Sequence, residues 1–178
     1  MDTGGVRVFI ACSLDGFIAG ANGDLSWLPA PDSTGEDYGY HAFLAETEAI
    51  LMGRATYDVA ARFDSWPYGR TPVFVATSRS LDPVAPTVRA VSGSASELLA
   101  AVRAETGGSI YLDGGALIRS FLDADLIDTL TVTVVGVVLG TGVPLFAGAA
   151  QRRELRLVDA VPYPSGLVQL RYVVSRSS

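Results

Sequence analysis

Short apolar runs and helical patterns alternate along most of the chain, and this alternation limits the possible folds. The runs at 6–13, 49–52, 72–77, 87–91 and 109–112 are predicted strands. Helical spacing or stop signals predict helices at 38–46, 54–62, 95–105 and 115–124. Strands alone are predicted in the last third, at 127–138, 154–161 and 168–174. This order predicts an α/β fold with a mixed, mostly parallel central sheet, an antiparallel C-terminal end and helices on both faces.

The composition suits one globular unit. The chain has 178 residues, of which 49% are hydrophobic and 18% are charged, a balance that favours a packed core over disorder. The length suits one domain better than two. No stretch has the composition of a linker, so we expect a single domain over residues 1–178.

Charge and cysteine content narrow the classes of partner. The net charge of −6 disfavours non-specific binding to nucleic acid or anionic membranes, although a few local cations still allow an anionic ligand. Cys12 is the only cysteine, so no internal disulfide forms and a reducing compartment is expected. The apolar run at 6–14 is too short to span a membrane and lacks a signal-peptide layout. We therefore expect a cytoplasmic protein without nucleic-acid or membrane partners.

A glycine turn follows the predicted strand at 109–112. Asp113, Gly114 and Gly115 lead from this strand into a helix. Glycine lets the backbone approach a ligand closely, and the N–H groups at a helix start attract phosphate. The segment lacks the full G-x-G-x-x-G fingerprint of dinucleotide-binding proteins. Taken alone, it fits a phosphate-binding turn and an ordinary tight turn equally well.

Two further turns carry arginines. Gly53 and Arg54 follow one predicted strand, and Ser78 and Arg79 follow the next. An arginine at a helix start needs an anionic partner, which is either a phosphate or a nearby carboxylate. The hydroxyl of Ser78 and the guanidinium of Arg79 suit a phosphate monoester such as the 2′-phosphate of NADP. The alternative interpretation of this segment is a solvated loop. Because ligands bind at the carboxyl ends of parallel strands, the three turns together indicate a nucleotide site.

Asp37 and His41 are the remaining candidates for chemistry. An aspartate before a helix usually caps it, but one that points into a pocket can bind the N–H groups of an amino-heterocycle. His41, the only histidine, is an acid–base candidate or a partly buried packing residue beside Tyr40 and Phe43. No cluster of His, Cys or Asp has the spacing of metal ligands, so no metal is expected.

The order of these motifs resembles that of the dihydrofolate reductase superfamily. It runs from Ser13-Leu14-Asp15-Gly16 through Trp27, Asp37, Leu51-Met52-Gly53-Arg54, Thr56-Tyr57 and Thr77-Ser78-Arg79 to Asp113-Gly114-Gly115. The first motif and the segment at 139–146 are typical of the branch that contains the reductase domain of the riboflavin-biosynthesis deaminase-reductase. The resemblance covers about residues 6–174 and implies the three-layer dihydrofolate reductase-like fold.

The resemblance also implies an NADPH site. The residues that match its adenosine-phosphate half are Gly53, Arg54, Thr56, Ser78 and Arg79. The residues that match the turn under the pyrophosphate are Gly114, Gly115, Ala116 and Leu117. Ala11 and Ile18 match residues that line the nicotinamide. Asp37 lies as far before Met52 as the acid that anchors the pterin in dihydrofolate reductases. Trp27 and Thr133 match further residues of that substrate site, and we add His41 to them.

The sequence departs from both branches at the substrate end. Ala116 stands where pterin enzymes usually have a third glycine, and no basic pair for a ribose phosphate is evident. We expect an NADPH-dependent reductase that transfers a hydride to a C=N or C=O bond of a small pterin- or pyrimidine-like heterocycle, with Asp37 as the catalytic residue that orients it.

Two alternatives remain. The chain could be a nucleotide-binding protein of the same fold without turnover, or a purely structural dimer module. The resemblance implies a homodimer, and the apolar run at 132–139 fits a dimer face and a central strand equally well.

Overall fold

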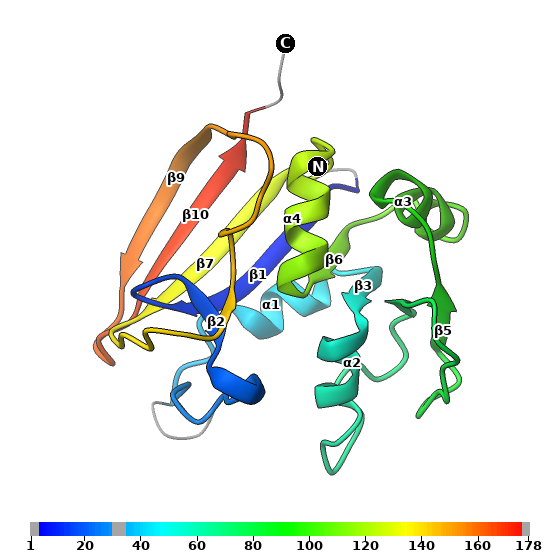
Figure 1. Cartoon of the computed structure of the whole chain (residues 1–178), viewed down its shortest axis with the longest axis horizontal. Coiled ribbons are helices and arrows are strands. Elements are labelled where there is room, and N and C mark those ends of the chain that lie inside the picture. Colours follow the sequence, from blue (N-terminus) through cyan, green and yellow to red (C-terminus); the bar gives the residue numbers. More distant parts are fainter. Residues whose placement is uncertain (1–3, 30–34, 176–178) are drawn as a thin grey trace.

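The computed structural model describes residues 4–29 and 35–175, and an eight-stranded sheet forms its centre (Figure 1). The strand order is β5-β4-β3-β6-β1-β7-β10-β9. These strands are β1 (Val6–Ser13), β3 (Ala49–Gly53), β4 (Val73–Ala76), β5 (Val88–Val91), β6 (Ile110–Asp113), β7 (Thr129–Val135), β9 (Leu155–Pro162) and β10 (Val168–Val174). Neighbours from β5 across to β7 are parallel, whereas β10 and β9 are antiparallel. The predicted mixed sheet with an antiparallel end is confirmed.

Helices cover both faces of this sheet, which gives three layers. The helices are α1 (Tyr40–Ala45), α2 (Arg54–Ala60), α3 (Ala95–Arg103) and α4 (Gly115–Asp123). Leu98 of α3 and Phe121 of α4 belong to the core on one face, and Phe43 of α1 and Tyr57 of α2 belong to the core on the other. Figure 1 shows α4 crossing in front of the sheet, with α1 behind it.

The alternation along β6 explains how one strand serves both cores. Ile110 and Leu112 pack into the core beneath α3 and α4, and Tyr111 packs into the core beneath α1 and α2. All three are almost fully buried, as expected for a central parallel strand. By the same alternation, Asp113 lies on the α1 face at the carboxyl end of the strand.

A second, two-stranded sheet lies beside the carboxyl end of β1. It pairs β2 (Phe17–Ala19) with β8 (Val143–Pro144), and a short 3-10 helix (Ala21–Gly23) follows β2. The sequence does not predict β8, because two residues are too few to show the alternation of apolar and polar side chains that marks a strand. In Figure 1 this small sheet lies to the left of the lower end of α4.

Several predicted elements are shorter in the structure. The strand predicted at 127–138 ends at Val135, where a turn closes with Val137 N donating to the Val135 carbonyl at 2.7 Å. The helix predicted at 38–46 begins only at Tyr40, because Tyr38 and Gly39 have φ values of 54° and 80°. Among the described residues, no helix is long and apolar enough to cross a membrane.

Candidate functional site

The three turns singled out in the sequence lie at one edge of the sheet. β3, β4 and β6 are parallel neighbours, so Gly53, Ala76 and Asp113 all end their strands on the same side. The turn before α4 contacts the turn before α2: a Cβ placed on Gly114 would lie 3.3 Å from the backbone nitrogen of Gly53. The structure therefore brings the predicted cofactor-binding residues of α2 and α4 together.

Both helix starts at this point lack a side-chain cap. α4 begins after Gly114 and α2 after Gly53, with no capping side chain and no acid in the first turn of either helix. By contrast, α3 has a full capping box, in which Ser94 and Glu97 satisfy the first N–H groups. Two uncapped helix starts that lie next to each other each present free N–H groups and a positive dipole end. This donor set fits a pyrophosphate.

Packing alone accounts for one of the two glycines. A Cβ on Gly115 would lie 2.9 Å from both Ile18 Cδ1 and the Pro144 carbonyl oxygen. Gly115 is therefore required because β2 and β8 lie against the start of α4. Gly114 has φ +106°, a region that favours glycine. The next residues, Ala116 and Leu117, complete the first turn of α4, where Ala116 is exposed and Leu117 is buried.

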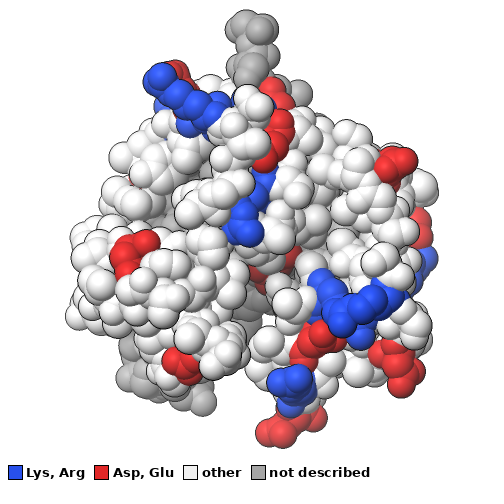
Figure 2. Space-filling model, in the orientation of Figure 1, with Lys and Arg blue, Asp and Glu red and all other residues white. Residues whose placement is uncertain are grey.

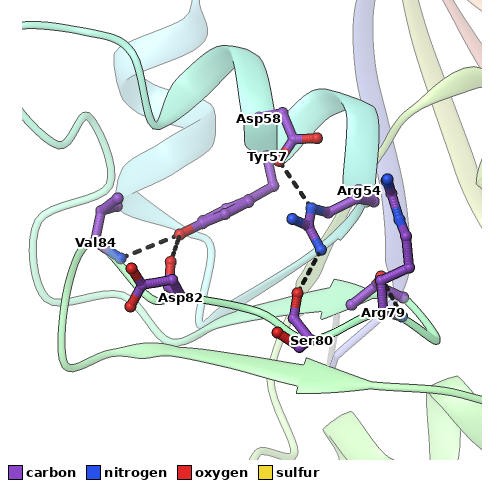
Figure 3. A network of polar contacts seen from close by, with 8 residues as sticks. Arg54, Tyr57, Asp58, Arg79, Ser80, Asp82 and Val84 are labelled. Atoms are coloured by element: carbon purple, nitrogen blue, oxygen red, sulfur yellow. Dashed lines mark hydrogen bonds and ion pairs between the residues drawn. The ribbon is translucent and has the colours of Figure 1, made fainter.

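Arg54 has its anionic partner within the protein. Its Nε donates to Asp58 Oδ1 at 2.8 Å, and its Nη1 donates to the Ser80 carbonyl at 3.0 Å (Figure 3). Of the two readings of this arginine, the structure shows the carboxylate-paired one. Tyr57 also holds the loop, since its hydroxyl donates to the Asp82 carbonyl at 2.9 Å. These bonds fix the segment that carries residues 78 and 79.

Arg79 differs from Arg54 in that its side chain is exposed to solvent. Ser78 and Arg79 are exposed, and the backbone N–H of Arg79 donates to Thr77 Oγ1 at 3.1 Å. In the described part of the chain, no ion pair or hydrogen bond engages its guanidinium. Figure 3 shows Arg79 beside Arg54. Thr56 lies between the two turns, because its Oγ1 would be 3.0 Å from a Cβ on Gly114.

Ala11 and Ile18 lie on the other side of the α4 start. Ala11 is paired with Thr133 of β7, and both are on the face covered by α1. Ile18, on β2, contacts the turn at Gly115. The two residues are partly exposed, so they border open space at the carboxyl end of β1.

A carboxyl with three tyrosines lies on the α1 face of the same edge. Asp113 keeps some exposed surface, yet burial around its carboxyl raises its pKa to about 6, against the lowering effect of hydrogen bonds from Tyr111 and Gly114. Burial and the nearby Asp113 charge raise the pKa of Tyr40 to about 12 and raise those of Tyr68 and Tyr111 further. Sequence reasoning missed this cluster, because its members come from three distant segments.

Asp37 holds the start of α1. It accepts hydrogen bonds from Gly39 N at 3.1 Å and His41 N at 3.0 Å, and its Oδ2 lies 2.8 Å from His41 Nδ1. The bonds from His41 and Gly39 lower the pKa of Asp37. The His41 side chain is 84% exposed, so it is not a packing residue. The carboxylate of Asp37 is itself 44% exposed and remains accessible to a ligand.

Thr133 and Trp27, the other two predicted substrate-site residues, differ in burial. Thr133 is buried, and Gln169 Nε2 donates to its Oγ1 at 3.1 Å and to the Tyr38 carbonyl at 3.0 Å. Thr133 is thus linked through Gln169 to the segment that carries Asp37. Trp27 is partly exposed, and its Nε1 donates to the Asp24 carbonyl at 3.1 Å.

Asp15 ties two motifs together that the sequence shows only as separate segments. Its carboxylate accepts from Ser13 Oγ at 2.6 Å, Leu139 N at 3.1 Å and Gly140 N at 2.7 Å. Ser13 Oγ in turn accepts from Phe17 N at 2.9 Å. The hydrogen bond from Ser13 is the main reason that the pKa of Asp15 is lowered. These contacts fasten the β1–β2 turn to the loop after β7.

The surface view shows how these parts surround a hollow. Figure 2 shows a depression below the start of α4, with the β2 segment on one side and α2 on the other. Basic side chains gather on the α2 side, towards β5. Within the described ranges, no group of three or more His, Cys, Asp or Glu side chains could hold a metal ion.

This arrangement of sheet, helices and glycine turn is the dihydrofolate reductase-like fold. Dihydrofolate reductase from Enterococcus faecalis, solved with NADP(H) and RAB-propyl, matches it with a TM-score of 0.67 at 18% identity over 96% of each chain. At that identity the likeness concerns the fold alone.

The chain belongs to the RibD C-terminal domain family, whose model matches residues 5–169. A Shewanella sp. PV-4 protein assigned by its name to riboflavin biosynthesis matches with a TM-score of 0.86 at 34% identity, over 97% of this chain and 99% of that one. YwjB of Bacillus subtilis, named as uncharacterized, is 34% identical over 93% of this chain and 95% of its own length. The resemblance to the riboflavin-reductase branch is confirmed.

Proposed function

We propose that the protein is an NADPH-dependent reductase that transfers a hydride to a C=N or C=O bond of a small heterocyclic substrate. The observation that carries this proposal is the meeting of two uncapped helix starts at the carboxyl edge of the sheet. Membership of the RibD C-terminal domain family supports it. Two neighbours of the same fold also support it: a deaminase/reductase from Thermotoga maritima and a dihydrofolate reductase solved with NADP(H).

Different residues at this edge of the sheet would bind different parts of the cofactor. The N–H groups of Gly53 and of the first turn of α4, Gly115 to Leu117, would bind the pyrophosphate. Ser78 and Arg79 would bind the 2′-phosphate, with Arg54 and Thr56 holding their loop and turn in place. Ala11 and Ile18 would flank the nicotinamide, which supplies the hydride when bound.

The substrate would occupy the α1 side of the hollow. Asp37 would present its 44% exposed carboxylate there, and His41 Nδ1 lies 2.8 Å from its Oδ2. Thr133 and Trp27 would border the same space. A carboxylate in this position accepts N–H bonds from an amino-heterocycle and fixes its orientation beside the hydride donor.

The test compares the binding of NADPH and NADH. Charge-assisted hydrogen bonds contribute about 1.5–3 kcal/mol, so Arg79→Ala should weaken NADPH binding by about 10–100-fold and leave NADH binding unchanged. Arg152→Ala is the matched control, since Arg152 is 87% exposed and pairs only locally with Glu154. Equal affinity of the wild-type protein for the two nucleotides would contradict the assignment of NADPH.

Turnover is tested separately from binding. NADPH oxidation is followed with dihydrofolate, 5-amino-6-(5-phosphoribosylamino)uracil and small carbonyl compounds as probes. Oxidation that depends on one of these probes is the expected result. Tight NADPH binding without oxidation by any probe would instead favour a nucleotide-binding protein without turnover.

A further inference from the structure

The turn between β9 and β10 contacts the segment that carries Asp37. Tyr38 Oη donates to Ser165 Oγ of this turn at 3.0 Å, and the rings of Tyr38 and Tyr163 meet edge to face with their centroids 4.8 Å apart. Burial, together with the charges of Glu36 and Asp37, raises the pKa of Tyr163, so these charges lie near its hydroxyl. The turn therefore lies against the end of the site that the proposed function gives to the substrate.

This turn is fastened to the central sheet. Tyr163 N donates to the Leu167 carbonyl, and Gly166 N donates to the Tyr163 carbonyl, both at 2.9 Å. β10, which follows the turn, is paired with β9 on one side and with β7 on the other. The turn is thus a fixed support for whatever packs against it.

Tyr38 has a backbone conformation that needs such a support. Its φ of 54° lies in the left-handed region, which is uncommon for an aromatic residue, and Gly39 follows with a φ of 80°. These two residues bend the chain between Asp37 and the first turn of α1. A conformation of this kind persists only where surrounding contacts hold it, and it occurs most often at functional sites.

Gln169 of β10 joins this bend to β7. Its Nε2 donates to the Tyr38 carbonyl at 3.0 Å and to Thr133 Oγ1 at 3.1 Å. A carbonyl can only accept, so the nitrogen of the amide and not its oxygen faces Tyr38. Thr133 therefore accepts from Gln169 and keeps its own hydroxyl proton for another acceptor. In the described part of the chain, no hydrogen bond uses that proton.

Gln169 also ends a row of side chains that leads across the sheet from the nicotinamide end. Ala11 of β1 is paired with Thr133 of β7, and Thr133 is paired with Gln169, so all three lie on one face. Neighbouring strands are about 4.8 Å apart, which gives the row a length of about 10 Å. Thr133 thus lies between the residue assigned to the nicotinamide and the residue that holds the bend at Tyr38.

We infer that Gln169 is a positioning residue of the substrate site. It holds the bend at Tyr38 against β7, so that the Asp37 carboxylate keeps its place beside the ligand, and it leaves Thr133 as a hydrogen-bond donor. A bound heterocycle would then offer N–H groups to Asp37 and an accepting nitrogen or oxygen to Thr133. The inference rests on the proposed function and adds the residue that fixes these two groups relative to each other.

The first test needs no ligand. Gly39 N and His41 N donate to Asp37, so hydrogen exchange of these two amides reports how firmly the carboxylate is held. Gln169→Leu removes both N–H groups of the amide, and Gln169→Glu removes them at unchanged length, so either variant should speed this exchange severalfold. Gln151→Leu is the matched control, because Gln151 is exposed and lies outside the sheet, and it should leave both amides unchanged.

The second test separates positioning from general support of the fold. The probe is 2,4-diaminopyrimidine, which carries amino N–H groups for Asp37 and a ring nitrogen for Thr133. Its affinity for the protein loaded with NADP⁺ should fall about 10–100-fold in Gln169→Leu, whereas the affinity for NADPH should not change. The fall should be much smaller when Asp37→Asn is already present, because the two residues act in one network.

Several outcomes would overturn the inference and leave the cofactor assignment intact. These are unchanged exchange at residues 39 and 41 in both variants of Gln169, losses that add fully to that of Asp37→Asn, and an equal loss of NADPH affinity. A wild-type protein that binds NADP⁺ but not 2,4-diaminopyrimidine would also overturn it. A wild-type protein that binds neither NADPH nor NADH would instead refute the proposed function, which the exchange measurement does not test.

Discussion

At the scale of residues, the atoms around Gly115 leave no room for a larger side chain. A Cβ on Gly115 would meet Ile18 Cδ1 and the Pro144 carbonyl at 2.9 Å, and the carbonyl is backbone that cannot rotate away. Gly115→Ala should therefore destabilise the protein by about 1–3 kcal/mol, the usual cost of overpacking. Chemical denaturation measures the change in the free energy of unfolding.

Gly136→Ala is the control for that prediction. A Cβ on Gly136 would meet nothing within 4 Å, and its φ is not in the positive region. This change should be neutral or stabilise by up to about 1 kcal/mol, because alanine restricts the unfolded chain. If the two variants were equally stable, the close packing of β2 and β8 against α4 would be wrong.

At the scale of elements, Asp15 joins two loops that lie far apart in the sequence. Asp15→Asn replaces one accepting oxygen by an NH₂ group, which cannot accept from Leu139 N or Gly140 N. Hydrogen exchange of these two amides should become severalfold faster. The matched control is Asp24→Asn, because the Asp24 carboxylate accepts from the N and Oγ of nearby Ser26, and the change should leave residues 139 and 140 unaffected.

The same contact has a defined pH dependence. Hydrogen bonds lower the pKa of Asp15 in the folded protein, so its contribution to stability is complete above the unfolded pKa of about 3.9 and is lost as the pH falls through the folded value. The difference in melting temperature between wild type and Asp15→Asn should therefore shrink below about pH 4. A difference that stays constant to pH 2 would contradict a role for the carboxylate charge.

Long periodic segments were predictable, and contacts between segments were not. The strand at 168–174 has its predicted bounds because alternation continues to both ends. The helix predicted at 54–62 ends at Ala60. The motifs around Asp15 and Gly140 were both recognised, but no local pattern indicates that one binds the other, because that contact depends on where β7 ends.

At the scale of the whole molecule, the sheet explains why much of the candidate site was predictable. Parallel strands place their carboxyl ends at one edge, so Gly53, Arg79 and Gly114 could be expected together before any coordinates. The Asp113 cluster could not, since Tyr40, Tyr68 and Asp113 meet only after α1 and the segment after α2 pack on one face. Sequence order carries no information on that packing.

Residues 132–135 of the run at 132–139 belong to the central strand β7, which lies between β1 and β10, and residues 136–139 follow the end of that strand. β7 therefore has no free edge for a partner, whereas β9, at the end of the strand order, has one. It is an edge strand whose Leu157 and Val158 are 50% and 46% exposed beside an irregularity in its pairing with β10. An exposed edge with apolar side chains favours association.

We predict a homodimer that forms through this edge of β9. Val158→Lys should convert it to a monomer, because a charged side chain in the interface would lose its hydration without gaining a partner. Sedimentation velocity measures the mass in solution. Val84→Lys is the control, since Val84 is 51% exposed in the loop before β5, far from β9 in the sheet order, and should leave the mass unchanged. A wild-type protein that sediments as a monomer, or a Val158→Lys variant that stays dimeric, would show that β9 is not the interface.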